Sequence, residues 1–239
     1  MYGLRIVGTH GIAQIDSEYK NMVLVNKQQV TIPAYVPPSS GFATFPFPAA
    51  ASYYRVVSNS VIAVRKLSHF DSSVASTVGI WQTDIVNESG VHTGSGVDIQ
   101  GGSSSAMTVI VYEFAFSGYD TSGYGLVVRN AANEVVFSSN NKPMRVVGSS
   151  RSDNLDLGAR PKITLPANRE YAIAMPERLH ETAMYMGRRI DYWGGFNQIH
   201  SGSNYVFSHN AMGIPSASTS TPTYARYMQH LVAIDVTGY

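Results

Sequence analysis

The chain has 239 residues, with 17 Lys and Arg against 16 Asp and Glu, and it has no cysteine. A net charge of +1 argues against capture of nucleic acid or of an acidic membrane as its main activity, and the lack of cysteine excludes disulfides, thiolate metal sites and a cysteine nucleophile. The 15 Tyr, 21 Gly and 11 Pro predict an all-β chain, and no apolar run is long enough to insert into a membrane.

The first predicted element is a short β-hairpin. Residues 4–7 and 12–15 are rich in apolar side chains and flank the turn-forming sequence Gly8-Thr9-His10-Gly11. A third strand is predicted at residues 22–25. Residues 32–51 hold five prolines and three phenylalanines, which predicts a long loop with its aromatic rings tucked under the sheet. Further strands are predicted at residues 53–57, 60–66, 77–82 and 108–116.

The second half of the chain is predicted to follow the same order. Residues 126–129 and 134–137 flank an Asn-rich turn, and a third strand is predicted at residues 144–147. Further strands are predicted at residues 171–175, 183–186, 204–208 and 230–236. The Ser- and Thr-rich stretch 201–222 favours a second loop, and no segment has the apolar period of a helix.

Two segments of the chain resemble each other at an offset of 122 residues. Residues 2–25 and 124–147 share seven identities in 24 positions, including the Tyr-Gly-Leu that begins each segment. Residues 114–119 likewise match residues 234–239, Ser-Gly-Tyr against Thr-Gly-Tyr. A third match pairs Phe47-Pro48-Ala49 and Tyr53 with Leu165-Pro166-Ala167 and Tyr171.

The repeat predicts a tandem duplication. We expect two similar β-sandwich domains, residues 1–122 and 123–239, because units of about 120 residues are of ordinary domain size. Two similar hairpins within one domain are the alternative. We also expect Met22 and Met144 to be buried and Arg145 to be exposed, and Met144→Asp to unfold only the second domain.

The sequence offers no motif for catalysis. The seven histidines lack the helical spacing of a zinc protease, and there is no phosphate-binding loop. Gly94-Ser95-Gly96 and Gly101-Gly102-Ser103 precede no helical pattern, so they are interpreted as flexible turns and not as nucleophile elbows. The 16 acidic residues include no recognisable catalytic pair. We therefore expect a protein that is not an enzyme and holds neither a metal nor a cofactor.

Two aromatic clusters are the candidate contact residues. Tyr, Trp and Arg are enriched at protein interfaces, and aromatic rings beside amides and carboxylates also suit glycans. Core packing of these rings is the structural alternative. The candidates are Tyr53 and Tyr54 in the first half and Arg188, Arg189, Asp191, Tyr192, Trp193 and Phe196 in the second.

The repeated segment resembles a module of small structural proteins of tailed bacteriophages. In the second half the module runs from Gly125-Leu126-Val127-Val128 through Phe137-Ser138-Ser139 to Lys142-Pro143-Met144-Arg145-Val146-Val147. The first half keeps Gly3-Leu4 and Lys20 but has Asn21 and Val23 in place of the Pro and Arg. The resemblance implies a virion protein, and it brings no catalytic residues.

The function expected from these features is assembly at the tail tip or baseplate of a phage. The expected partners are other tail proteins, in several copies within a symmetric particle, with no nucleic acid and no membrane. Because Met1-Tyr2-Gly3-Leu4-Arg5 lacks a signal-peptide pattern, we expect assembly in the host cytoplasm and release within the virion. Receptor binding to a host glycan or pilus, capsid decoration and glycan hydrolysis are the alternatives.

Overall fold

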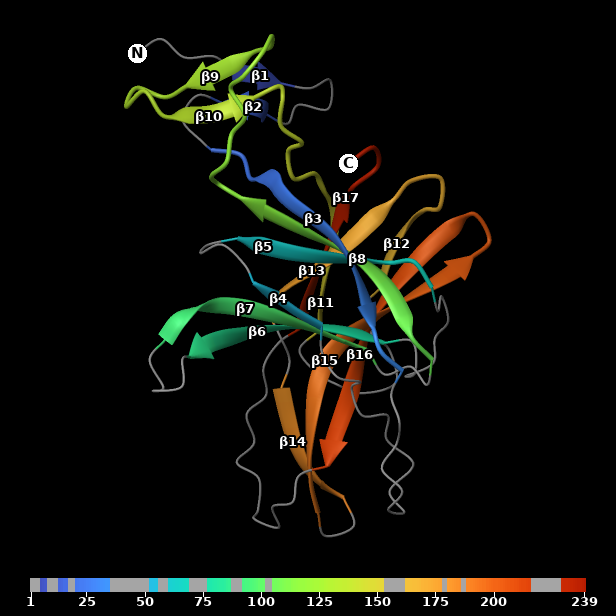
Figure 1. Cartoon of the computed structure of the whole chain (residues 1–239). Coiled ribbons are helices and arrows are strands. Elements are labelled where there is room, and N and C mark those ends of the chain that lie inside the picture. The colour runs from blue at the N-terminus through green and yellow to red at the C-terminus, as the bar shows by residue number, and fades with distance from the viewer. Residues whose placement is uncertain are drawn as a thin grey trace.

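The computed structural model shows an all-β protein built from antiparallel strands, and its described residues include no helix (Figure 1). It describes residues 5–7, 13–16, 20–34, 52–55, 60–68, 77–86, 92–101, 105–152, 162–177, 180–185, 188–215 and 229–239. The predicted fold class is confirmed at this level.

Each half of the chain begins with a short hairpin. Strand β1 (Arg5–Val7) pairs with β2 (Ala13–Asp16), and β9 (Val127–Arg129) pairs with β10 (Val135–Ser138). Ile6 lies opposite Ile15 in the first hairpin, and Val128 lies opposite Phe137 in the second. These residues match at the offset of 122, so both predicted hairpins form with the same register. The hairpins gather at one end of the molecule (Figure 1).

The other strands form two larger sheets. The six-stranded sheet has the order β11 (Val146–Ser152), β17 (Gln229–Asp235), β13 (Tyr171–Glu177), β5 (Val61–Lys66), β8 (Met107–Ala115) and β3 (Val23–Ile32). The seven-stranded sheet has the order β12 (Lys162–Pro166), β16 (Asn204–Pro215), β15 (Arg188–Ser201), β6 (Val78–Val86), β7 (His92–Gly101) and β4 (Ser52–Arg55), with β14 (His180–Tyr185) also paired to β15.

Both large sheets combine strands from the two halves of the chain. Strands β5 and β13 join the halves in the six-stranded sheet, where Ala63 lies opposite Ala174 and Val64 opposite Ile173. Strands β6 and β15 join them in the seven-stranded sheet, where Val78 lies opposite Phe196. Two independent sandwiches at residues 1–122 and 123–239 are therefore not confirmed, because the halves share their sheets.

The strand order of each sheet is the same when it is followed outward from the junction of the halves. In the six-stranded sheet it runs β5, β8, β3 on one side and β13, β17, β11 on the other. In the seven-stranded sheet it runs β6, β7, β4 and β15, β16, β12. We number the strands of each half from its hairpin onward and leave out β14. In both halves the six-stranded sheet then contains the third, sixth and first strands, and the seven-stranded sheet contains the fourth, fifth and second. The two halves thus have the same topology.

The core lies between the two sheets and contains side chains from both halves. Alternate residues of a strand point to opposite faces. On β8, Val109 and Val111 belong to the core between the sheets, whereas Tyr112 and Phe114 belong to a second apolar cluster on the other face of the six-stranded sheet. Because one core joins both halves, its burial stabilises them together.

The methionines of the repeat pack against this second cluster. Arg145 is exposed, as the sequence predicts, whereas Met22 and Met144 are half-buried there and not fully buried as expected. The two methionines also lie side by side, because the N–H of Met144 donates to the carbonyl of Met22 at 2.8 Å and the N–H of Leu24 donates to that of Lys142 at 2.8 Å. Matching residues of the two halves thus meet each other.

Two sequence predictions need correction. Gly94-Ser95-Gly96 is not a flexible turn but lies within β7, where each residue pairs with β6. Residues 201–222 are not a single loop, since β15 and β16 form a hairpin around Gly202, at φ +58°. Of the loop predicted at residues 32–51, residues 35–51 lie outside the described residues, as does the stretch 216–228.

The third self-match of the sequence is wrong. Tyr53 lies in β4 of the seven-stranded sheet, whereas Tyr171 lies in β13 of the six-stranded sheet. The strand equivalent to β4 is β12, and their first residues, Ser52 and Lys162, are 110 positions apart and not 118. A local similarity of four residues cannot detect such a change of offset.

Candidate functional site

The predicted contact residues lie on two separate strands of one sheet. Tyr53 and Tyr54 are in β4, opposite Asp98 and Val97 of β7. The second group, Arg188, Arg189, Asp191, Tyr192 and Trp193, is in the part of β15 that pairs with β14. Strands β6 and β7 lie between β15 and β4 in the sheet, and the second group lies in the part of β15 that pairs with β14 and not with β6. Strand pairing therefore does not bring them into one site.

The predicted contact residue Phe196 is instead a core residue. Its side chain is fully buried in the core between the sheets, and it pairs with Val78 where the halves meet. A ring in that position is closed to any partner in the folded chain. Core packing, the alternative given above for this aromatic cluster, is therefore confirmed at Phe196.

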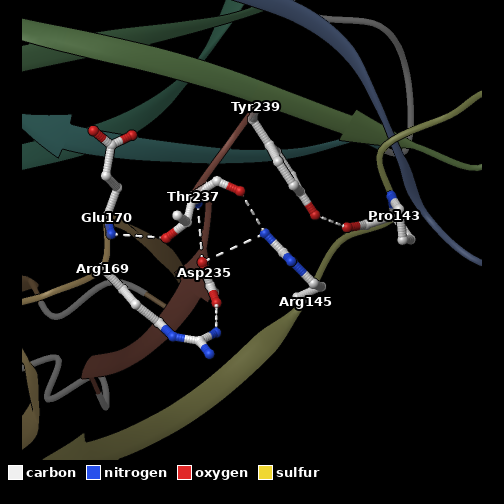
Figure 2. A network of polar contacts seen from close by, with 7 residues as sticks. All are labelled: Pro143, Arg145, Arg169, Glu170, Asp235, Thr237 and Tyr239. Atoms are coloured by element: carbon white, nitrogen blue, oxygen red, sulfur yellow. Dashed lines mark hydrogen bonds and ion pairs between the residues drawn. The ribbon is translucent and has the colours of Figure 1, made fainter.

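A network of polar contacts surrounds Asp235 at the end of β17 (Figure 2). The Asp235 side chain is 2% exposed. Its Oδ2 accepts a hydrogen bond from Arg169 at 2.7 Å, and its Oδ1 accepts one from the backbone N–H of Thr237 at 2.9 Å. Arg145 lies 3.4 Å from the same Oδ1 and donates to the carbonyl of Thr237 at 2.8 Å. Two cations thus compensate one buried carboxylate.

These contacts set the protonation state of Asp235. Burial alone would raise the pKa of its carboxyl group, but the hydrogen bonds from Thr237 and the ion pairs with Arg169 and Arg145 outweigh burial and hold the pKa below its ordinary value. Asp235 is therefore an anion at neutral pH, and its role is to connect β17 to the start of β11 and to the β12–β13 turn.

The network explains the Lys-Pro-Met-Arg sequence of the repeat. The Arg145 guanidinium lies 4.8 Å from the centre of the Tyr239 ring, and the Tyr239 hydroxyl donates to the carbonyl of Pro143. In the first half, the matching Tyr119 donates in the same way to the carbonyl of Asn21. Val23 and Ala115 occupy the places of Arg145 and Asp235 there. The tyrosine contact is thus common to both halves, and the ion pairs belong to the second alone.

A pocket of about 240 Å³ lies between the two sheets beside this network. The six-stranded sheet and its turns provide Arg65, Lys66, Leu67, Arg169, Glu170 and Tyr171, and the seven-stranded sheet provides Gln198 and Tyr205. Glu170 forms an ion pair with Arg65 at 2.8 Å. Because Arg65 and Glu170 come from different halves, this pocket exists only where the halves meet.

None of the contact residues predicted from the sequence lines this pocket. Arg65 and Lys66 end an apolar strand, Arg169 and Glu170 form a turn, and Gln198 lies more than 130 positions beyond Arg65. No local spacing connects these positions, since strand pairing between the halves brings them together. Only knowledge of the β5–β13 contact would have revealed them.

In the part of the chain that the structure describes, no group of three His, Asp or Glu side chains is placed to hold a metal ion. Within the same residues, no helix is long and apolar enough to cross a membrane. Comparisons with family models, with curated proteins and with solved structures found no match to this chain.

Proposed function

We propose that the chain is a structural protein of a tailed-phage virion, located at the tail tip or baseplate, and that it acts through contacts with neighbouring proteins. We further propose that its two halves arose by duplication and pair as an internal dimer. The resemblance of the repeated segment to phage structural proteins supports the first statement. The strand order shared by the halves carries the second.

Several independent features agree with an internal dimer. The hairpins share a register, and the final tyrosines, Tyr119 and Tyr239, make matching hydrogen bonds. The preceding glycines, Gly118 and Gly238, have φ values of +75° and +76°. Where the halves join, Ala63 faces Ala174, each within an Ile-Ala pair. In a two-fold dimer, matching residues meet near the axis in this way.

This architecture suits assembly because each sheet has two equivalent outer strands, one from each half. Among the described strands, β3 and β11 are the outer strands of one sheet, and β4 and β12 are those of the other. An outer strand has backbone groups that can pair with a strand of another chain. Two equivalent edges per sheet allow one chain to contact two neighbours in a symmetric particle.

A second candidate function is binding of a host receptor. The pocket beside Asp235 favours it, because cations, an amide and tyrosine rings converge there. The sequence contains no symmetric counterpart of this pocket. When Ala63 is aligned with Ala174, Arg65 and Lys66 correspond to Pro176 and Glu177. This role is compatible with a position at the tail tip.

Electron cryomicroscopy of purified particles tests the proposed location. We expect density for the two-sheet sandwich at the tail tip or baseplate, in several symmetry-related copies. Density on the capsid would move the chain to the decoration alternative. Absence of the chain from purified particles, established by mass spectrometry, would contradict the virion proposal altogether.

A further inference from the structure

The outer strands of the six-stranded sheet have equivalent places but different side chains. On β3, residues 26–29, Asn-Lys-Gln-Gln, are all exposed. A lysine on an outer strand disfavours pairing with a further strand, because its charge would lose contact with water. On β11, Val146 is 52% exposed and Val147 is 43% exposed, and the strand contains no lysine. Of these two edges, β11 is therefore the one that suits an added strand.

The outer strands of the seven-stranded sheet are less suited to strand addition than β11. Strand β4 has four residues and ends in Arg55, and β12 begins with Lys162 and ends in Pro166, which has no backbone N–H to donate. Strand β11 has seven residues, and among the described strands it pairs with β17 alone. Its register with β17 is regular from Gly148 to Ser152. A regular strand of this length gives a partner several backbone groups to pair with.

Charge decides which pairing of outer strands is favourable between two copies of the chain. In an antiparallel pair of identical strands, the central residues face each other. The centre of β3 is Lys27-Gln28, so a pair of β3 strands brings two lysines together, and pairing of β3 with β11 sets Lys27 close to Arg151. The centre of β11 is Gly148-Ser149-Ser150, which is small and uncharged. In a pair of β11 strands, each Arg151 lies about 14 Å from its copy, beyond the Debye length of about 8 Å at physiological salt.

The junction of the two halves is a precedent for such a pairing in the same sheet. There β5 and β13 are antiparallel, and the small pair Ala63–Ala174 lies beside the branched pair Val64–Ile173. Strand β11 has a similar composition, since its small central residues follow two exposed valines. Branched side chains pack well across neighbouring strands. A second copy on β11 would therefore continue the sheet by the same kind of contact that joins the halves.

We propose that β11 is an interaction surface for a second copy of the chain, whose own β11 pairs with it in antiparallel orientation. The result is a two-fold dimer with one continuous sheet, and it closes at two chains because each β11 covers the other. This inference rests on the proposed use of outer strands in assembly and names the partner at one of them. Its test uses the purified chain, so its outcome is separate from the location of the chain in a particle.

Sedimentation velocity of the full chain, from about 1 to about 100 µM, tests the dimer. We expect a monomer at the lowest concentration and a dimer at the highest, with a Kd on the order of 10 µM, because one strand pair is smaller than a standard interface. A chain that stays monomeric at about 100 µM would leave β11 to a strand of another protein and overturn the proposal. A series of species larger than the dimer, as head-to-tail pairing produces, would overturn it as well.

Two matched lysine variants test the assigned edge. Ser149→Lys sets two cations face to face at the centre of the pair, so we expect the Kd to rise at least about tenfold. Gln28→Lys introduces the same charge at an exposed position of β3 and should leave the Kd unchanged. Both variants should keep the circular dichroism spectrum of the parent, because both positions are exposed. Parental affinity in folded Ser149→Lys, or equal weakening by both variants, would contradict pairing through β11.

Discussion

Asp235 shows how one carboxylate fastens three segments of the second half. It contacts Arg169 before β13, Arg145 before β11 and the backbone of Thr237. Both arginines are partly exposed, so their removal would leave a buried anion uncompensated, whereas removal of Asp235 would leave two solvated cations. The carboxylate is therefore the safer position at which to test the network.

We expect Asp235→Asn to lower the free energy of unfolding by about 1–3 kcal/mol at neutral pH, because hydrogen bonds to a charged group are lost. The folded pKa of Asp235 is below its unfolded value, so its contribution is complete above the unfolded pKa and disappears as pH falls through the folded pKa. Urea unfolding from pH 7 down to about pH 3 should show the variant and the parent converging in acid. A constant difference over this range would contradict the assignment.

Gly118 and Gly238 allow a comparison of the two halves at matching positions. Both have φ near +75°, which disfavours any side chain by about 1 kcal/mol. A Cβ at Gly118 would lie 3.1 Å from Cγ1 of Val25, whereas one at Gly238 would meet nothing within 4 Å. We expect Gly118→Ala to destabilise the protein more than Gly238→Ala, as measured by guanidinium unfolding. The reverse order, or no cost at either position, would count against equivalent turns.

At the scale of elements, the sequence predicts the short hairpins and the apolar strands well. Strands such as β8 and β17 contain short continuous runs of Val, Leu, Ile and other apolar residues, and these runs can be recognised in the sequence. Strand β7 cannot be predicted from the sequence, because His92–Gly101 contains three glycines and its order comes from pairing with β6. The sequence does not predict the pocket for the same reason, since its side chains meet only through pairing between distant strands.

The Met22–Met144 contact makes a prediction at this scale. Met144 packs against the cluster on the outer face of the six-stranded sheet, to which strands of both halves contribute. We expect Met144→Asp to cost more than about 2 kcal/mol and to lower the stability of the whole sandwich in one transition, seen by calorimetry.

A matched control for this variant is Val147→Asp, on β11. Val147 is 43% exposed, so the substitution should change stability by less than about 0.5 kcal/mol. Two transitions in Met144→Asp, with the first half unaffected, would restore the view that the sequence repeat marks two independent domains.

At the scale of the whole molecule, one sandwich is shared by two similar halves. The repeat reveals two related segments, but it does not indicate whether the halves form two separate domains or contribute strands to the same sheets. That choice depends on Ala63, Val64, Ile173 and Ala174, which lie in strands that the repeat does not cover. Small side chains at the central Ala63–Ala174 pair let the two strands approach, and continuous burial around them favours one core over two.

Disulfide formation between Ala63→Cys and Ala174→Cys tests the shared architecture most directly, because the natural chain has no cysteine. Opposed residues of antiparallel strands lie about 4.5–5.5 Å apart at Cα, which suits a disulfide. Mild oxidation should give an intramolecular disulfide in the double variant, seen as a mobility shift on a non-reducing gel, and none in the control Ala63→Cys with Ala233→Cys, whose second position faces the opposite side of the sheet. If the first pair stays reduced in folded protein, the two halves do not share a sheet, and the account of an internal dimer is contradicted.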